Sequence, residues 1–84
     1  MKVQVRYFAS IREVLGTGES IELHEETTTV GEVRDRLIAS SAAHATALAR
    51  GRALRSALNQ ALCDESAVVD ADAELAFFPP VTGG

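Results

Sequence analysis

The N-terminal end of the chain shows a regular alternation of apolar and polar residues. Residues 2–8 read KVQVRYF, and a period of two is typical of a strand with one buried face. The same reasoning predicts four more strands, over residues 20–24, 58–63, 68–69 and 74–78. The two faces of the first strand differ: one holds Val3, Val5 and Tyr7, the other Gln4, Arg6 and Phe8.

Two sequences with the spacing of a capping box predict where helices begin. Ser10–Glu13 precedes a short helix that should end at Gly16, since glycine favours helix ends. Thr29–Glu32 precedes the main predicted helix, and the alanine-rich residues 39–53 predict a second, less regular one. The main helix has an apolar and a polar side: Val30, Val33, Leu37 and Ile38 on the first, Arg34 and Asp35 on the second.

These elements predict one α+β domain over residues 1–78, followed by a flexible, extended tail over residues 79–84. A main helix packed across a small mixed sheet is the economical way to bury the apolar faces. The first and last strands are short and rich in β-forming residues. We therefore expect them side by side at the centre of the sheet.

Composition agrees with a single small domain. The chain has 84 residues, of which 46% are hydrophobic, and Cys63 is its only cysteine. An intrachain disulfide is therefore impossible, and the core must rely on packing alone. The start of the chain lacks the apolar run of a signal peptide, and no stretch reaches bilayer length. We expect a cytoplasmic protein that does not bind membranes.

Charge is unevenly distributed along the chain. All eight Lys and Arg residues precede Cys63, whereas residues 64–84 hold five acidic residues and no basic one. An acidic segment repels nucleic acid and favours a basic protein surface as partner. The alternative is a solvated loop without a binding role. The acidic residues are Asp64, Glu65, Asp70, Asp72 and Glu74.

Residues that could carry out catalysis are few and scattered. His24 and His44 lie far apart, without a cysteine or paired carboxylate at metal-ligand spacing. Gly16 and Gly18 do not continue into a phosphate-binding loop. Cys63 is interpreted as a small buried apolar residue. We therefore expect no bound metal, no bound cofactor and no catalytic centre in this chain.

Three large apolar residues are predicted on the otherwise polar face of the sheet. Phe8 shares its face with Arg6, Leu62 with Gln60, and Phe78 with Ala76. If their strands adjoin, Phe8, Leu62 and Phe78 form one exposed patch, which is typical of a partner-binding surface. The alternative is that a helix covers this face.

The sequence ends in FFPPVTGG, and its last six residues form the predicted tail: Pro79, Pro80, Val81, Thr82, Gly83 and Gly84. The prolines and the β-branched pair favour an extended backbone, which would reach about 20 Å. Two glycines let the backbone enter a channel too narrow for side chains. A carboxylate at the tip must be activated, for example by adenylation, before sulfur or an amine attacks it. The catalytic residues would then lie in partner proteins.

Three segments of the chain resemble the small subunit of molybdopterin synthase. They are VRYFASIREVLG near the start, LNQAL at residues 58–62, and DADAELAFFPPVTGG at the end. That family has the ubiquitin-like β-grasp fold and belongs to the sulfur carriers. The resemblance therefore implies an α+β domain of this kind.

The resemblance also implies a function for individual residues. The carboxylate of Gly84 would be adenylated with ATP by an E1-like adenylyltransferase and converted to a thiocarboxylate. The tail would then enter the large subunit of the synthase, within a heterotetramer of two small and two large subunits. There its sulfur would pass to cyclic pyranopterin monophosphate to build the dithiolene of molybdopterin. Phe8, Leu62 and Phe78 match positions that pack against partners.

Other functions for a Gly-Gly tail stay open. A sulfur carrier for thiamine or another product would share the fold and the two glycines, although the FFPPVTGG tail disfavours it. A ubiquitin-like modifier would be joined to lysines of other proteins. A plain interaction module would tolerate additions after Gly84.

Overall fold

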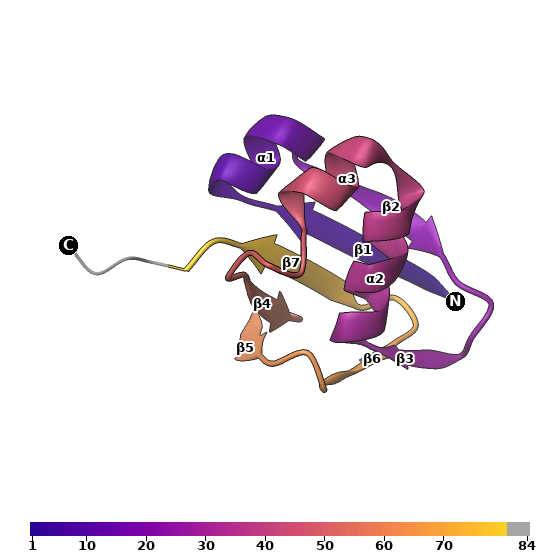
Figure 1. The fold of residues 1–84 in the computed structure, drawn as a ribbon. Coiled ribbons are helices and arrows are strands. Elements are labelled where there is room, and N and C mark those ends of the chain that lie inside the picture. Colours follow the sequence, from indigo (N-terminus) through magenta and orange to yellow (C-terminus); the bar gives the residue numbers. More distant parts are fainter. Residues whose placement is uncertain (81–84) are drawn as a thin grey trace.

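The computed structural model describes residues 1–80, which form an α+β domain (Figure 1). The strands are β1 (Lys2–Tyr7), β2 (Gly18–Glu22), β3 (Thr27–Thr29), β4 (Arg55–Leu58), β5 (Ala61–Cys63), β6 (Val68–Asp70) and β7 (Glu74–Phe78). The helices are α1 (Ala9–Leu15), α2 (Val30–Ser40) and α3 (Ala42–Ala47). No helix in this part of the chain is both long and apolar enough to cross a membrane.

Five strands form one mixed sheet in the order β2-β1-β7-β4-β5. β1 and β7 run parallel at its centre, which confirms the expected pairing of the first and last strands. The other neighbouring pairs in this sheet are antiparallel. β3 and β6 pair separately, as a short antiparallel ribbon. The centre of the sheet thus joins the two ends of the domain.

The helices cover one face of the five-stranded sheet (Figure 1). Alternate residues of each central strand therefore point into the core. On β1, Val3, Val5 and Tyr7 are buried, and the residues between them are exposed, as the alternation predicted. On β7, Leu75 and Phe77 are buried in the same way. The opposite face of the sheet carries the remaining residues of both strands.

The predicted capping box at Ser10 is wrong. α1 begins directly after Phe8, whose backbone is extended, and no side chain caps the helix. Phe8 is therefore not the last residue of the strand but the junction between β1 and α1. Ala9 takes a left-handed φ of 53°, which turns the chain sharply into the helix. The helix ends at Gly16, as predicted, where the glycine N–H donates to the Arg12 carbonyl at 2.8 Å.

The predicted start of the main helix is confirmed, but one residue on its polar side was misplaced. Thr29 caps α2, its hydroxyl accepting from the Glu32 N–H at 3.2 Å. Arg34, expected on the polar side, is only 4% exposed. The loop that follows α3 folds against it, so its guanidinium donates to the carbonyls of Leu48 and Ala49. The sequence pattern could not show that this loop covers the helix.

The predicted single strand over residues 58–63 is also wrong, because the chain forms a hairpin there. β4 and β5 are joined by Asn59 and Gln60, whose φ angles of 50° and 71° are both left-handed. Two left-handed residues in succession are typical of the tightest hairpin turns. The expected second helix is confined to α3, which Ser41 caps by accepting from the His44 N–H.

Candidate partner-binding face and carrier site

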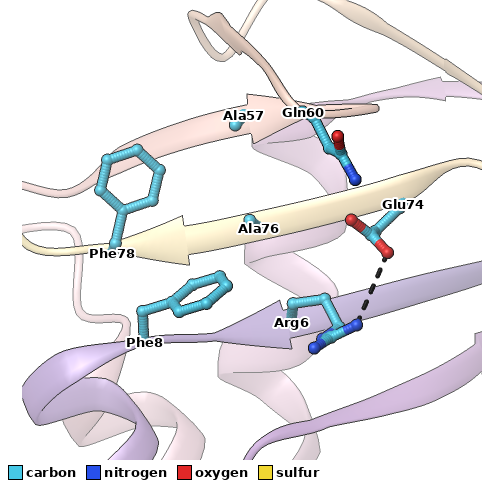
Figure 2. A pocket seen from close by; sticks show the side chains of 7 residues that line it. All are labelled: Arg6, Phe8, Ala57, Gln60, Glu74, Ala76 and Phe78. Atoms are coloured by element: carbon cyan, nitrogen blue, oxygen red, sulfur yellow. Dashed lines mark ion pairs between the residues drawn. The ribbon is translucent and has the colours of Figure 1, made fainter.

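Phe8 and Phe78 lie side by side on the sheet face that the helices leave open (Figure 2). They line one end of a shallow hollow of about 390 Å³, and Phe8 is 43% exposed. Exposed aromatic residues around a concave surface are typical of partner-binding sites. The hollow is lined by Arg6, Phe8, Ala57, Gln60, Glu74, Ala76 and Phe78.

The parallel pairing of β1 and β7 brings these two phenylalanines together. Tyr7 is the register partner of Phe77, so the residues that follow each of them, Phe8 and Phe78, are also neighbours. The Phe8 N–H donates to the Phe77 carbonyl at 3.3 Å, which extends the pairing by one residue. Since Tyr7 and Phe77 point into the core, the two phenyl rings face the open side.

Leu62 lies farther away on the same face. It is on the edge strand β5 and pairs with Ala57, which in turn pairs with Ala76 of β7. Its side chain is 67% exposed and does not line the hollow. Phe8 and Phe78 are therefore close enough for one side chain of a partner to contact both of them. Leu62 is not, because β4 lies between its strand and β7. Whether these three residues contact a partner stays a prediction.

The other end of the hollow is polar, and sequence reasoning missed it (Figure 2). An Arg6 guanidinium nitrogen lies 3.6 Å from a carboxylate oxygen of Glu74, and Gln60 borders the same end. Arg6 and Glu74 face each other because Gln4 is the register partner of Glu74, two residues before Arg6. Gln60 reaches the hollow from the hairpin turn. If Asn59 and Gln60 had been recognised as a turn, the sequence would have placed Gln60 near this end of the sheet.

The predicted tail begins where this face ends. Pro79 and Pro80 follow β7 directly and are partly buried. Val81, Thr82, Gly83 and Gly84 lie outside the described residues. The last described residues thus leave the domain beside the Phe8 and Phe78 pair, so a ligand bound to the open face would meet the start of the tail.

The acidic segment is partly neutralised within the domain. Glu65 forms ion pairs with Arg34, at 2.7 Å, and with Arg50. Burial acts to raise the pKa of Glu65, but the hydrogen bonds from the two arginines outweigh it and hold this pKa below its ordinary value. Hydrogen bonds from Ser66 likewise lower the pKa of Asp64. A role of this segment in attracting a basic partner stays a prediction.

His44 and Cys63 make structural contacts in the described part of the chain. No group of three or more potential metal-binding side chains occurs in residues 1–80. His44 hydrogen-bonds Glu19 at 2.7 Å and Ser41 at 2.6 Å, which ties α3 to the sheet. Cys63, interpreted as buried, is only partly buried: it packs against the core, and its sulfur lies 3.6 Å from the Ser56 hydroxyl oxygen.

This combination of features defines a small β-grasp domain of the ubiquitin-like class, with an exposed Phe8 and a partly exposed Phe78 beside its C-terminal end. The model of the ThiS family matches residues 5–84. The chain belongs to this family.

Individual relatives cover almost the whole chain. A molybdopterin synthase sulfur carrier subunit from Haemophilus influenzae is 43% identical over 98% of this chain and 99% of that protein. The protein of the same name from Escherichia coli is 41% identical over the same shares. Among solved structures, small archaeal modifier protein 1 of H. volcanii is 26% identical. It has a TM-score of 0.74 and covers 95% of this chain and 98% of that one.

Proposed function

We propose that this protein is the sulfur carrier subunit of a molybdopterin synthase. The observation that carries the proposal is the identity of 41–43%, over nearly the whole chain, to two proteins of that name. The pair formed by Phe8 and the partly exposed Phe78 on the open face supports it, because a carrier needs a surface that its partners can bind. We expect the protein to act in the cytoplasm.

The chemistry would take place at the carboxylate of Gly84. A carboxylate oxygen attacks the α-phosphorus of ATP, forming an acyl adenylate and releasing pyrophosphate. Hydrosulfide from a sulfur donor then attacks the carbonyl carbon, and AMP leaves, so that a thiocarboxylate results. The thiocarboxylate sulfur forms a bond to a carbon of cyclic pyranopterin monophosphate, and water then cleaves the bond between this sulfur and the Gly84 carbonyl carbon, which restores the carboxylate. Two such transfers complete the molybdopterin dithiolene. The carrier holds no cofactor of its own, and ATP serves the activating enzyme.

Two proteins would supply the catalytic groups. An E1-like adenylyltransferase would activate Gly84, and the large subunit of the synthase would bind the pterin substrate. The large subunit would hold the carrier in a heterotetramer of two small and two large subunits. The open sheet face would fix the domain on the partner, and residues 79–84 would reach the partner's active site. The carrier itself would be non-catalytic.

The experiment that tests this proposal adds one alanine after Gly84. The extra residue moves the carboxylate carbon by about 3.3–3.6 Å, and a misplacement of about 1 Å can lower a rate about 100-fold. We expect ATP–pyrophosphate exchange with the activating enzyme and molybdopterin formation with the large subunit both to fail. Mass spectrometry of the unextended protein should show the gain that replacement of one oxygen by sulfur gives.

Two controls make the experiment specific. A circular dichroism melt should show that the extended carrier folds like the original, and its intact mass should show that the alanine was not removed. An alanine inserted beside Gly51, in an exposed loop with room for a side chain, keeps the added mass but leaves Gly84 in place. An unclipped, extended carrier with full activity would refute the proposal.

A second candidate function is that of a protein modifier. The observation that favours it is the likeness to small archaeal modifier protein 1. The adenylated Gly84 would then be attacked by a lysine amine, and AMP would leave as an amide bond forms. Detection of this chain joined to lysines of other cellular proteins, in the absence of a thiocarboxylate form, would favour this function over sulfur transfer.

A further inference from the structure

The polar end of the hollow contains a residue in an unfavourable backbone conformation. Gln60 has a φ of 71°, in the left-handed region where a side chain is disfavoured. The second position of such a hairpin turn is usually glycine, which takes this conformation without a steric penalty. Residues held in disfavoured conformations occur most often at functional sites.

Two hydrogen bonds to Glu74, at the start of β7, fix the turn that contains Gln60. The Asn59 N–H donates to the Glu74 carbonyl at 2.8 Å, and the Asn59 side-chain oxygen accepts from the Glu74 N–H at 3.0 Å. Asn59 thus fastens the hairpin to the start of β7. These two bonds fix the direction in which the next residue projects its side chain. Gln60 consequently points over Glu74 into the hollow (Figure 2).

The polar groups at this end have unused hydrogen-bonding capacity. Neither the Gln60 amide nor the Glu74 carboxylate accepts or donates a side-chain hydrogen bond to another described residue. The separation of 3.6 Å between Arg6 and Glu74 marks an ion pair longer than a hydrogen bond, between side chains that are 52% and 39% exposed. Such exposed pairs are weak and are easily exchanged for another partner.

We infer that Gln60 and Glu74 are specificity-determining residues that bind a cationic side chain of the carrier's protein partner. This inference rests on the proposed function, since the partner used to test it is the synthase large subunit. The Gln60 side-chain oxygen and the Glu74 carboxylate accept from the incoming guanidinium or ammonium group. An apolar side chain of the same partner packs between Phe8 and Phe78. Glu74 is the one acidic side chain among those that line the hollow, and an ionised carboxylate only accepts hydrogen bonds, so the group that it binds together with Gln60 is a donor.

Substitution of Gln60 by glycine separates binding from folding. Gln60→Gly removes the amide and relaxes the left-handed backbone, so its melting temperature should equal or exceed that of the original protein. Its affinity for the large subunit, measured by titration calorimetry, should nevertheless fall by at least about 5-fold. A residue that serves only the turn would show the opposite: an unchanged affinity.

Two charge substitutions identify the sign of the partner group. Glu74→Gln should weaken binding about tenfold because a charge-assisted hydrogen bond is lost. Arg6→Gln should bind at least as tightly as the original protein, because it frees the Glu74 carboxylate from a competing cation. Glu26→Gln, in the loop between β2 and β3, is the matched control for the change in net charge. It should bind like the original protein.

Several results would overturn the inference. A Gln60→Gly protein that folds as stably as the original and binds with unchanged affinity would show that the side chain has no binding role. Loss of binding in Arg6→Gln but not in Glu74→Gln would show that the partner group is anionic. If the unsubstituted carrier does not bind the large subunit, the proposed function fails as well. If the unsubstituted carrier binds the large subunit, and the Gln60→Gly and Glu74→Gln variants bind it equally well, the inference alone fails.

Discussion

Phe77 and Phe78 are adjacent and chemically identical, yet they lie on opposite faces of the same strand. Phe77 is 1% exposed and belongs to the core beneath the helices. Phe78 is only partly buried and lines the hollow on the open face with Phe8. Because side chains alternate along a strand, one position decides between a folding role and a binding role. Residue type alone would have assigned both phenylalanines to the core.

The difference extends to the neighbours of each residue. Around Phe77 the sheet carries the apolar residues Val5, Tyr7 and Leu75, each at most 1% exposed. Around Phe78 it carries alanines and the ionised pair of Arg6 and Glu74. The covered face is therefore built to exclude water, whereas the open face keeps a large apolar side chain next to charged ones. A surface of that kind suits association with a partner that also has to dissociate.

Truncation of the two phenylalanines should have very different effects on stability, and this is the largest expected effect. Phe77→Ala removes a fully buried ring and should lower the free energy of unfolding by about 3–5 kcal/mol. Phe78→Ala should lower it by less than about 1.5 kcal/mol, because the ring is partly in water already. Urea denaturation followed by circular dichroism measures both. Equal losses would mean that the open face is part of the core.

The arginines of α2 extend the comparison from apolar to charged residues. Arg34 is buried and donates to the carbonyls of Leu48 and Ala49 and to Glu65, whereas Arg36 is 45% exposed and pairs with Glu25. Arg34→Met leaves buried carbonyls without donors and should cost about 2–4 kcal/mol. Arg36→Met is the matched control.

Removal of the exposed Arg36 should cost at most about 1 kcal/mol. The same urea series measures both variants. An Arg34→Met protein as stable as Arg36→Met would show that the loop after α3 is not held by Arg34.

These residues also show how far the sequence predicts the structure. Alternation placed Val3, Val5 and Tyr7 correctly, because successive side chains of a strand point to opposite faces and the apolar set marks the buried one. The hairpin at Asn59 and Gln60 was missed because it lacks the glycine that usually marks such a turn. Because this turn was missed, the sequence analysis also missed that Gln60 borders the polar end of the hollow.

The burial of Arg34 was missed for a different reason. It depends on contacts with residues 48–52 and with Glu65, 31 positions away in the chain. A helical pattern describes only neighbours within a few turns, and a long-range contact leaves no trace in it. Phe8 illustrates a middle case: its exposure followed from alternation, whereas its place at the start of α1 did not.

A smaller, pH-dependent effect is expected where the covered side meets solvent. Burial acts to raise the pKa of Glu19, but hydrogen bonds from His44 and Tyr7 outweigh it and lower this pKa. A lowered pKa in the folded state stabilises the fold above the ordinary glutamate pKa of about 4.3. This contribution is lost as the pH falls through the lowered pKa.

Glu19→Gln should therefore lose stability at pH 6 but little at pH 3. At pH 6 the free energy of unfolding of Glu19→Gln should be lower than that of the original protein by less than about 1 kcal/mol, since the Glu19 side chain is 36% exposed. Thermal melts of both proteins across this pH range measure it. A difference that is as large at pH 3 as at pH 6 would contradict the assigned role of the Glu19 charge.

The most direct test of the division between the two faces is the affinity of Phe78→Asp for the large subunit of molybdopterin synthase. A carboxylate at this position adds a charge to the apolar end of the hollow without entering the core. We expect a circular dichroism melt close to that of the original protein. The binding free energy should be less favourable by at least about 2 kcal/mol, as for buried aromatic anchors at interfaces. A folded Phe78→Asp protein that binds with the original affinity would contradict the account.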